Sequence, residues 1–122
     1  MTPLIVLIVD DDARNRKLAR DVLGFAGFDT LEAATGEEAI ALAGERLPDV
    51  VLMDLRLPDL DGSEALRRLK AERATAHIPV VALTAVTGAR EALNDAGFAG
   101  TIEKPIDVRD FPNQVRRHCI AR

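Results

Sequence analysis

The sequence predicts an α/β fold in which five strands and five helices alternate along the chain and the strands form one parallel sheet. Short, continuous apolar runs recur along the chain, and such runs are typical of parallel strands covered on both faces. Amphipathic segments of helical spacing lie between the runs. Because the connections between these segments are short, the pattern favours right-handed crossovers with helices on both faces of the sheet.

Three apolar runs predict the central strands. They cover Leu4–Val9, Val50–Met53 and Ile78–Leu83, and each ends abruptly at a polar residue. Two further segments, Phe28–Ala33 and Thr101–Glu103, are weaker, because the first includes acidic side chains and the second is very short. Mixed or short segments suit the edges of a sheet, so we expect three central and two edge strands.

Five helices are expected between and after these strands. The segments are Ala13–Phe25, Thr35 through Ala43, Ser63–Ala71, Gly88–Ala96 and a last helix that begins near Asp110. Thr35 and Glu38 have the spacing of a capping box at the start of the second helix. Pro112 must lie in the first turn of the last helix, because a proline further inside would break it.

Three of these helices carry a clear apolar face, which we expect to pack against the sheet. On the first helix the face consists of Leu18, Ala19, Val22 and Leu23. On the third it consists of Leu66 and Leu69. On the last helix it consists of Val108, Phe111, Val115 and Cys119.

Length and composition restrict the function. At 122 residues the chain corresponds to one domain, and with 48% apolar residues it can form a core without disulfides. A single cysteine excludes an internal disulfide, and the formal charge of -4 argues against a nucleic-acid-binding protein. No apolar run reaches the length of a membrane span, and the N-terminus lacks a signal peptide. We therefore expect a soluble cytoplasmic domain without nucleic-acid or membrane partners.

Polar residues follow the predicted strands at the points where the strands end. Asp10 and Asp11, Asp54, Thr84 and Lys104 stand at the carboxyl ends of four separate strands. In an open parallel sheet the ligand crevice lies outside these ends, where the strand order reverses, so we expect the aspartates to converge. Two carboxylates about 4 Å apart repel by about 4 kcal/mol at an effective dielectric of about 20, so the cluster must be offset by protonation, by a cation or by a nearby lysine or arginine. Oxygen ligands with open water positions favour Mg²⁺ over Ca²⁺.

Carboxylates, a divalent cation, a lysine and a hydroxyl together suit a phosphoryl group. The sequence offers no Ser–His pair, no catalytic cysteine and no Walker-type glycine loop, so a carboxylate is the expected nucleophile and would form an acyl phosphate. Asp54 is the best candidate, because it stands alone on its strand, whereas Asp10 and Asp11 can both hold the metal.

In chain order the sequence contains the motifs LIVLIVDDDARNRKL, VLMDLRLPDLDG, VVALTA and EKPI. Together they resemble the receiver domain of two-component response regulators, from Leu4 to about Ala121. Four motifs in order with fitting separations are far more specific than any one of them. The resemblance implies a flavodoxin-like (βα)5 three-layer fold with strand order 2-1-3-4-5. It also implies that residues 1–122 form a single receiver domain with no output domain.

The resemblance also implies roles for the acidic residues. Asp54 matches the phosphoacceptor, which receives its phosphoryl group from a histidine kinase or a phosphotransfer protein. Asp11 matches the direct Mg²⁺ ligand, and Asp10 matches a ligand that acts largely through water. Asp54 and the backbone carbonyl of Arg56 complete the expected protein ligands of the ion. Asp12 is assigned no chemistry.

Further roles follow for the residues that face the phosphoryl group. Thr84 matches the switch hydroxyl that turns toward that group, and Ala85 matches the neighbouring backbone donor. Lys104, which precedes Pro105, matches the lysine that pairs with the phosphate.

The sequence departs from the receiver pattern in two places. Receivers usually carry Tyr or Phe three residues before the lysine, where this chain has Thr101. The segment from Thr84 to Lys104 is also slightly shorter than usual. Because both changes fall on the surface through which receivers commonly signal, a switch in this chain must act through Thr84, the Val86–Gly88 loop and packing.

The sequence favours a monomeric, stand-alone receiver, a Mg²⁺-dependent phosphorylatable switch and not an enzyme. Its partners would be a histidine kinase or phosphotransfer protein and a downstream protein. A degenerate receiver that docks partners without phosphorylation is the alternative, favoured by Thr101 and the shortened segment before Lys104 and opposed by the intact site residues. A flavodoxin-like cofactor binder is opposed by three consecutive carboxylates, which would repel a phosphate. A small phosphatase would need a cap domain and a general acid, which the sequence lacks.

The remaining basic residues leave two interpretations open. The first helix carries four basic residues, which form either a solvated face or a docking site for the phosphodonor: Arg14, Arg16, Lys17 and Arg20. His77 and His118 have no acidic or cysteine partner at ligand spacing, so we interpret them as structural or solvated.

Overall fold

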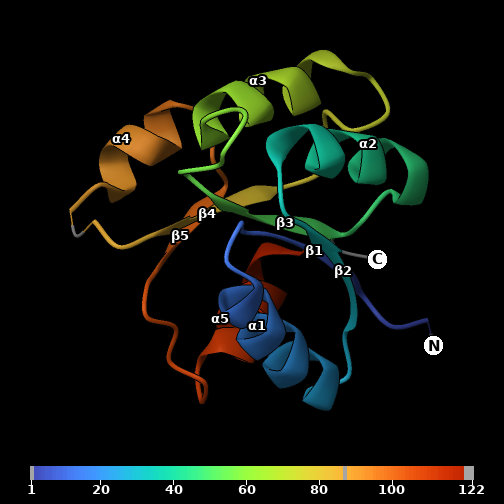
Figure 1. Ribbon diagram of the computed structural model, residues 1–122, viewed down its shortest axis with the longest axis vertical. Helices are drawn as coiled ribbons and strands as arrows, with labels where there is room; N and C mark the ends of the chain where they lie inside the picture. The colour runs from blue at the N-terminus through green and yellow to red at the C-terminus, as the bar shows by residue number, and fades with distance from the viewer. Residues whose placement is uncertain (1, 87, 120–122) are drawn as a thin grey trace.

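The computed structural model describes residues 2–86 and 88–119, in which five strands alternate with five helices. The strands are β1 (Ile5–Val9), β2 (Asp29–Ala33), β3 (Val50–Asp54), β4 (Val80–Thr84) and β5 (Gly100–Glu103). The helices are α1 (Ala13–Phe25), α2 (Gly36–Arg46), α3 (Gly62–Ala71), α4 (Arg90–Asp95) and α5 (Phe111–His118). Figure 1 shows three layers, with α2, α3 and α4 on one face of the sheet and α1 and α5 on the other.

The five strands form one parallel sheet in the order β2-β1-β3-β4-β5. This confirms the predicted flavodoxin-like architecture, including the strand order that the resemblance implied. From β1 the chain first adds β2 on one side and then continues on the other side with β3. Because the crossovers diverge at this point, a crevice opens at the carboxyl ends of β1 and β3.

The central strands are buried on both faces, as their continuous apolar runs predict. Along β1, Leu7 and Val9 belong to the core under α2, α3 and α4, whereas Val6 and Ile8 belong to the core under α1 and α5. This alternation follows from the two-residue period of a strand. All five residues of β4 are buried. The two cores fix the sheet between its helical layers, and thereby the strand ends that carry the polar residues.

Polar side chains on β2 mark it as an edge strand. Glu32 accepts hydrogen bonds from Arg16 Nε at 3.3 Å and from Arg20 Nη1 at 3.1 Å. These contacts connect β2 to α1, so two of the basic residues on α1 have partners within the domain. The mixed composition of β2 is explained by these contacts.

Three helices begin at side-chain caps. Asp12, Thr35 and Asp61 each accept a hydrogen bond from a backbone N–H of the first turn that follows. The capping box predicted at Thr35 is confirmed on one side only, because Glu38 Oε1 accepts from the Ala34 N–H at 3.3 Å and not from that of Thr35. Asp12 therefore has a structural role at the start of α1.

Two predicted apolar faces are wrong at one residue each. Leu18 is 45% exposed, although Ala19 and Leu23 on the same helix are buried. Val108 is 51% exposed and precedes α5, which begins at Phe111. Both errors arise because a helical period gives the direction of a side chain and not the extent of the neighbouring surface.

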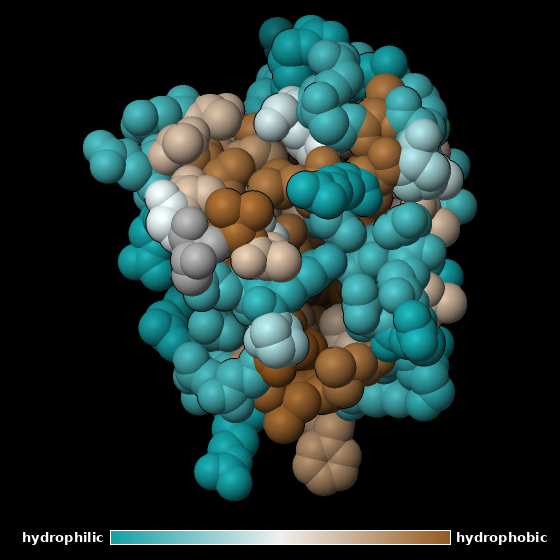
Figure 2. All heavy atoms as spheres, turned by 60° about the vertical axis from the view of Figure 1, so that its left-hand side comes forward, coloured by the Kyte–Doolittle hydropathy of each residue, from teal (hydrophilic) through white to brown (hydrophobic). Residues whose placement is uncertain are grey.

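Exposed apolar side chains gather on the layer formed by α1 and α5. Phe25 at the end of α1 is 98% exposed, and Leu18 and Val108 add to this surface. Figure 2 shows apolar atoms in its lower half, over this layer, and a hydrophilic band that separates them from a second apolar area above. None of the described helices is both long and apolar enough to cross a membrane.

Candidate functional site

The carboxyl ends of four strands carry the predicted site residues. Asp10 follows β1 directly, and Asp54 is the last residue of β3, its neighbour in the sheet. Thr84 ends β4, and Lys104 follows β5. Because parallel strands end at the same edge of a sheet, these residues meet in the crevice, as the sequence predicts.

Lys104 connects the two central aspartates. Its Nζ donates to Asp10 Oδ2 at 3.0 Å and to Asp54 Oδ2 at 3.1 Å. The side chains of Lys104, Asp10 and Asp54 are only 23%, 3% and 14% exposed, so solvent screens these ion pairs weakly. Burial alone lowers the pKa of Lys104, but the hydrogen bonds and charges of the two carboxylates outweigh burial, and the pKa is raised. The ammonium group is therefore kept charged within the site.

Asp10, Asp11 and Asp54 form a cluster that could hold a metal ion. One carboxylate oxygen of each lies within 4.8 Å of those of the other two. Three carboxylates and one ammonium leave a formal excess of two negative charges, which a divalent cation would balance. The donors are all oxygens, and Asp11 is exposed, so water can complete the coordination of a hard cation such as Mg²⁺.

Asp10 is held in place by neighbours that belong to α1 or precede it. Its Oδ1 accepts from the Asp12 N–H at 2.9 Å, and its Oδ2 accepts from Asn15 Nδ2 at 3.3 Å. Arg16 Nη1 donates to the Asp10 carbonyl at 2.7 Å. The sequence pattern does not single out Asn15. It lies in the first turn of α1, which begins just after the aspartates, and this places it near the carboxyl end of β1.

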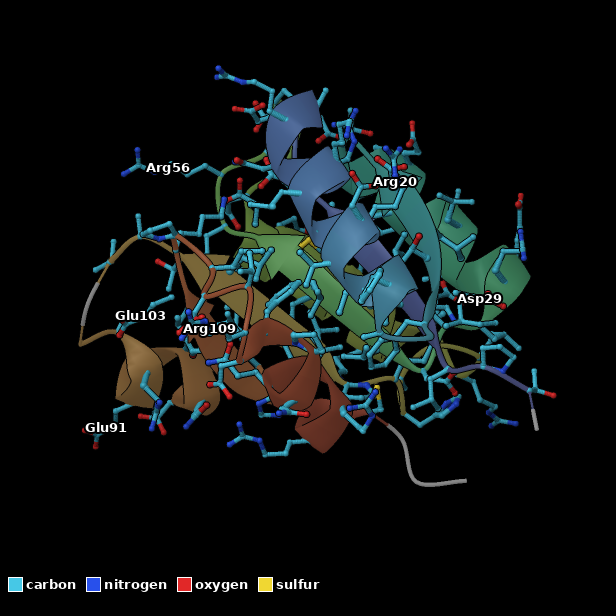
Figure 3. The ribbon with its side chains drawn as sticks, turned by 90° about the horizontal axis from the view of Figure 1, so that it is seen from below. Arg20, Asp29, Arg56, Glu91, Glu103 and Arg109 are labelled. Carbon is cyan, nitrogen blue, oxygen red and sulfur yellow. The ribbon has the colours of Figure 1, made fainter. Side chains whose placement is uncertain are left out.

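The segment after Asp54 is also held tightly. The Arg56 N–H donates to Asp54 Oδ1 at 3.1 Å, and the Gly62 N–H donates to the Leu55 carbonyl at 2.9 Å. A Cβ at Gly62 would lie 2.9 Å from Leu55 Cα, so only glycine allows α3 to begin this close to the end of β3. Figure 3 shows the Arg56 side chain extending away from the ribbon, and Arg56 is among the residues that line the cleft.

Thr84 lies at the other wall of the site. It is 3% exposed, and its Oγ1 accepts a hydrogen bond from the Val86 N–H at 3.0 Å. Its carbonyl accepts from the Lys104 N–H at 2.8 Å, which joins the ends of β4 and β5. Ala85 is exposed beside it. The predicted Val86–Gly88 switch loop includes Thr87, which lies outside the described residues.

The site residues border one cleft of about 480 Å³. They are Asp10, Asp11, Asp54, Arg56, Thr84, Ala85 and Lys104. A second recess of about 330 Å³ adjoins this cleft, and the two share Asp10, Asn15, Leu83, Ala85 and Lys104. The second recess continues to Leu18 and Ile106, so an apolar surface begins directly beside the acidic cluster.

Comparison with known proteins decides the family. Residues 6–116 match the response regulator receiver domain. The chain belongs to this family. The polar-differentiation response regulator DivK of Brucella anthropi is 38% identical over 118 residues, which cover 95% of this chain and 96% of that protein.

Solved structures of receivers share the fold. The chemotaxis response regulator CheY4 of Vibrio cholerae superposes with a TM-score of 0.89 and 27% identity, covering 95% of this chain and 98% of that one. The receiver domain of the sensor histidine kinase PA1611 from Pseudomonas aeruginosa has a TM-score of 0.86 and 30% identity, covering 96% and 98%. That structure contains a magnesium ion coordinated in its active-site cleft.

Membership in this family makes the chain a receiver domain of two-component signalling. Phosphoryl acceptance followed by a conformational switch is the general property of the family, and its members interact with histidine kinases and downstream proteins. This receiver differs from the usual pattern at Thr101, as the sequence indicates. Thr101 lies in β5, and its Oγ1 is buried without a hydrogen-bond partner among the described residues.

The basic residues of α1 are all paired inside the domain. Arg14 contacts Asp12, Lys17 contacts Asp21, and Arg16 and Arg20 contact Glu32. These ion pairs favour the interpretation of the basic residues as a solvated face, because their charges are compensated within the domain. The exposed apolar surface beside them is a stronger candidate for contact with another protein.

Proposed function

We propose that this receiver is a Mg²⁺-dependent phosphoryl acceptor with Asp54 as the acceptor residue. The observation that carries the proposal is the position of Lys104, whose ammonium group contacts both Asp10 and Asp54 inside the cleft. A lysine so placed can pair with a phosphoryl oxygen as well as with the carboxylates. Nothing else among the described residues combines a partly buried carboxylate, a cation and a cluster of oxygen ligands in one cleft.

In the proposed reaction, an Asp54 carboxylate oxygen attacks the phosphorus of a phosphohistidine. The new O–P bond forms as the N–P bond of the donor breaks, and the imidazole nitrogen keeps the bonding electron pair. Mg²⁺ bound by Asp10, Asp11, Asp54 and the Arg56 carbonyl would neutralise the negative charge gathered at the phosphoryl group. The Lys104 ammonium holds a phosphoryl oxygen, and the acyl phosphate remains on Asp54.

Thr84 and Ala85 would connect phosphorylation to a change of conformation. The Thr84 hydroxyl accepts from the Val86 N–H and keeps its own proton free to donate to a phosphoryl oxygen. The backbone N–H of Ala85 is a second donor on the same side of the cleft. A phosphoryl group adds about -1.5 to -2 charges, so it would draw these groups toward Asp54 and move the start of the loop after β4.

The partners proposed for this chain are a histidine kinase or phosphotransfer protein and a downstream protein. The apolar recess lined by Leu18 and Ile106 shares Lys104 with the acceptor cleft. A donor that brings its phosphohistidine to Asp54 must cover the rim of that cleft, and the recess gives it apolar surface to bury there.

A degenerate receiver that docks a partner without phosphorylation remains the second candidate function. The observation that favours it is Thr101, since a threonine cannot replace the packing of the usual aromatic side chain. The two candidates predict opposite results in the same experiment.

The test is incubation with a small acyl phosphate and Mg²⁺, followed by intact-mass measurement. We expect the mass of one phosphoryl group to be added, and the addition to disappear with Asp54→Asn or with a chelator. Asp29→Asn is the matched control, because Asp29 is exposed at the edge strand β2 and away from the cleft (Figure 3). No added mass would favour the docking module, and an addition that survives Asp54→Asn would overturn the assignment of the acceptor.

A further inference from the structure

A recess of about 300 Å³ lies along the free edge of β5, between α4 and α5. Its lining comes from three elements and consists of Arg90, Asn94, Ala99, Gly100, Thr101, Arg117 and His118. The recess is separate from the acceptor cleft, since the two have no lining residue in common. It includes Thr101, the residue at which this chain departs from the usual receiver pattern.

His118 closes one side of this recess. Its imidazole ring lies over Gly100, where a Cβ would overlap the ring atoms. Gly100 is buried, whereas His118 is half-buried. The absence of a side chain at position 100 is therefore what allows a ring from α5 to approach the edge strand.

The lining of the recess is basic. Among the described residues, Arg90, Arg117 and His118 are the titratable groups that face it, and no acidic side chain contributes to its lining. Arg90 has no ion pair or hydrogen bond within the described part of the chain, and Arg117 has only Asp110 at 3.6 Å together with weak local contacts. Figure 3 shows that Glu91, which follows Arg90, points outward from α4 and away from α5. The positive charge in the recess is thus largely uncompensated.

Thr101 adds an unsatisfied hydroxyl to this basic lining. Its Oγ1 is buried and has no partner among the described residues, although a buried hydroxyl without a hydrogen bond destabilises a fold. The Thr101 side chain faces the α4 side of the sheet, because its neighbour Ile102 packs under α1 and α5. A hydroxyl donor and two guanidinium groups therefore border the same recess from different elements.

We propose that this recess is an oxyanion-binding site that takes a carboxylate or phosphate group. Arg90 and Arg117 would supply charged donors from α4 and α5, and Thr101 would supply a hydroxyl from β5. Guanidinium groups match the planar and tetrahedral oxyanions because they offer several N–H donors in a fixed fork. The anion arrives either on an acidic segment of a partner protein or as a free small ion, and these two sources share the chemistry.

His118 provides a direct probe of occupancy. Burial lowers its pKa first, and the charges of Arg117 and Arg90 lower it further. An anion bound between those arginines would offset their effect and stabilise the imidazolium form, so the pKa of His118 must rise when the recess is filled. The sequence has only two histidines, and His77, in the segment before β4, serves as the internal reference.

The test is an NMR titration of both imidazole side chains with three probes added separately: acetate, inorganic phosphate and a short polyglutamate peptide. We expect saturable shifts at the Gly100 and Thr101 amides and a higher pKa for His118, with the His77 signals unchanged. Binding of all three probes with similar affinity identifies a free small ion, whereas clearly tighter binding of the peptide identifies an acidic protein segment. If no probe moves the His118 titration, or if both histidines respond equally, the proposal is overturned.

Variants connect the effect to the recess. Arg90→Gln and Arg117→Gln should each weaken binding by up to about fivefold, because a single exposed ion pair is worth up to about 1 kcal/mol. Thr101→Val removes the hydroxyl and nearly preserves the shape, so it keeps the fold and should also weaken binding. Arg73→Gln is the matched control, since Arg73 is an exposed arginine after α3 and outside the recess. The titration contains neither Mg²⁺ nor a phosphodonor, so its outcome does not depend on phosphorylation of Asp54.

Discussion

Replacement of Lys104 by methionine separates the electrostatic role of this residue from its size. Methionine preserves most of the side-chain volume and removes the ammonium group that contacts Asp10 and Asp54. The variant leaves three clustered carboxylates without their lysine. We expect it to unfold at a lower urea concentration than the unchanged protein when no divalent cation is present.

The magnitude follows from the distances in the cleft. Unit charges 4.8 Å apart interact by about 3.5 kcal/mol at an effective dielectric of about 20, and each aspartate would repel its neighbours on that scale. Removal of one partner from a fully buried ion pair costs about 3–5 kcal/mol, whereas an exposed pair contributes at most about 1 kcal/mol. Since the Lys104 side chain is 23% exposed, we expect an intermediate loss of about 2 kcal/mol in the free energy of unfolding.

Urea unfolding with and without Mg²⁺ is the assay. A cation at the cluster offsets the repulsion that Lys104 no longer compensates, so Mg²⁺ should raise the midpoint of Lys104→Met more than that of the unchanged protein. Asp54→Asn in the Lys104→Met background should recover part of the loss, because it removes one of the three charges.

Lys17→Met is the matched control for this experiment. Lys17 is 68% exposed and forms an i,i+4 pair with Asp21, so its loss should cost less than about 0.5 kcal/mol and should not respond to Mg²⁺. Equal midpoints for Lys104→Met and Lys17→Met, or no difference in their response to Mg²⁺, would refute the electrostatic account of the cluster.

Three further changes test the structure at other points. Gly62→Ala should destabilise the fold by about 1–3 kcal/mol in urea, because its Cβ would meet the Leu55 Cα at 2.9 Å and the Asp54 carbonyl at 3.0 Å. Gly44→Ala, where a Cβ meets nothing within 4 Å in the last turn of α2, should instead stabilise the fold, and a similar loss at both sites would contradict the close approach at Gly62. Asp59→Asn should lower the urea midpoint at neutral pH, because Asp59 accepts from the N–H groups of Glu37 and Gly36, which lower its pKa below the ordinary value of 3.8. That contribution is present above the ordinary pKa and is lost as the pH falls through the lowered one, so a difference from the unchanged protein that persists in strong acid would count against it. Stability measured by thermal melting should also fall at alkaline pH, because the pKa of Lys104 is raised above its ordinary value of 10.5 in the folded state. The contribution of Lys104 is present below the ordinary pKa and is lost as the pH rises through the raised one. Lys104→Met should show a smaller alkaline loss, and an equal loss would contradict this cause.

Much of the fold could be predicted because its signals are local. A continuous apolar run that ends at an aspartate gives both a buried parallel strand and its carboxyl end, and these ends meet wherever the strands are neighbours. The convergence of Asp10 and Asp54 follows from that rule and from the adjacency of β1 and β3. The adjacency itself came from the resemblance to receivers and not from the apolar pattern.

The errors and omissions concern surfaces that are set by distant residues. Leu18 has the right direction for a core position but remains exposed, because it borders the recess that Ile106 and Phe111 also line. The position of the His118 ring over Gly100 could not be predicted from the residues around His118, because it depends on how α5 packs against the edge strand β5. The start of α4 was predicted at Gly88, whose positive φ of 82° excludes a helical conformation.

The position of Thr101 constrains how a phosphoryl signal could leave Asp54. In this chain the ends of β4 and β5 are joined through the Lys104 N–H and the Thr84 carbonyl, while the Lys104 ammonium contacts Asp54. A phosphoryl group on Asp54 would therefore act on both strands at their shared end, without a rotating aromatic side chain. Lys104 lies three positions after Thr101, about 10 Å along an extended strand. The basic recess is thus close enough for its occupancy and the state of the acceptor to influence each other through β5, and by linkage any such effect must be reciprocal.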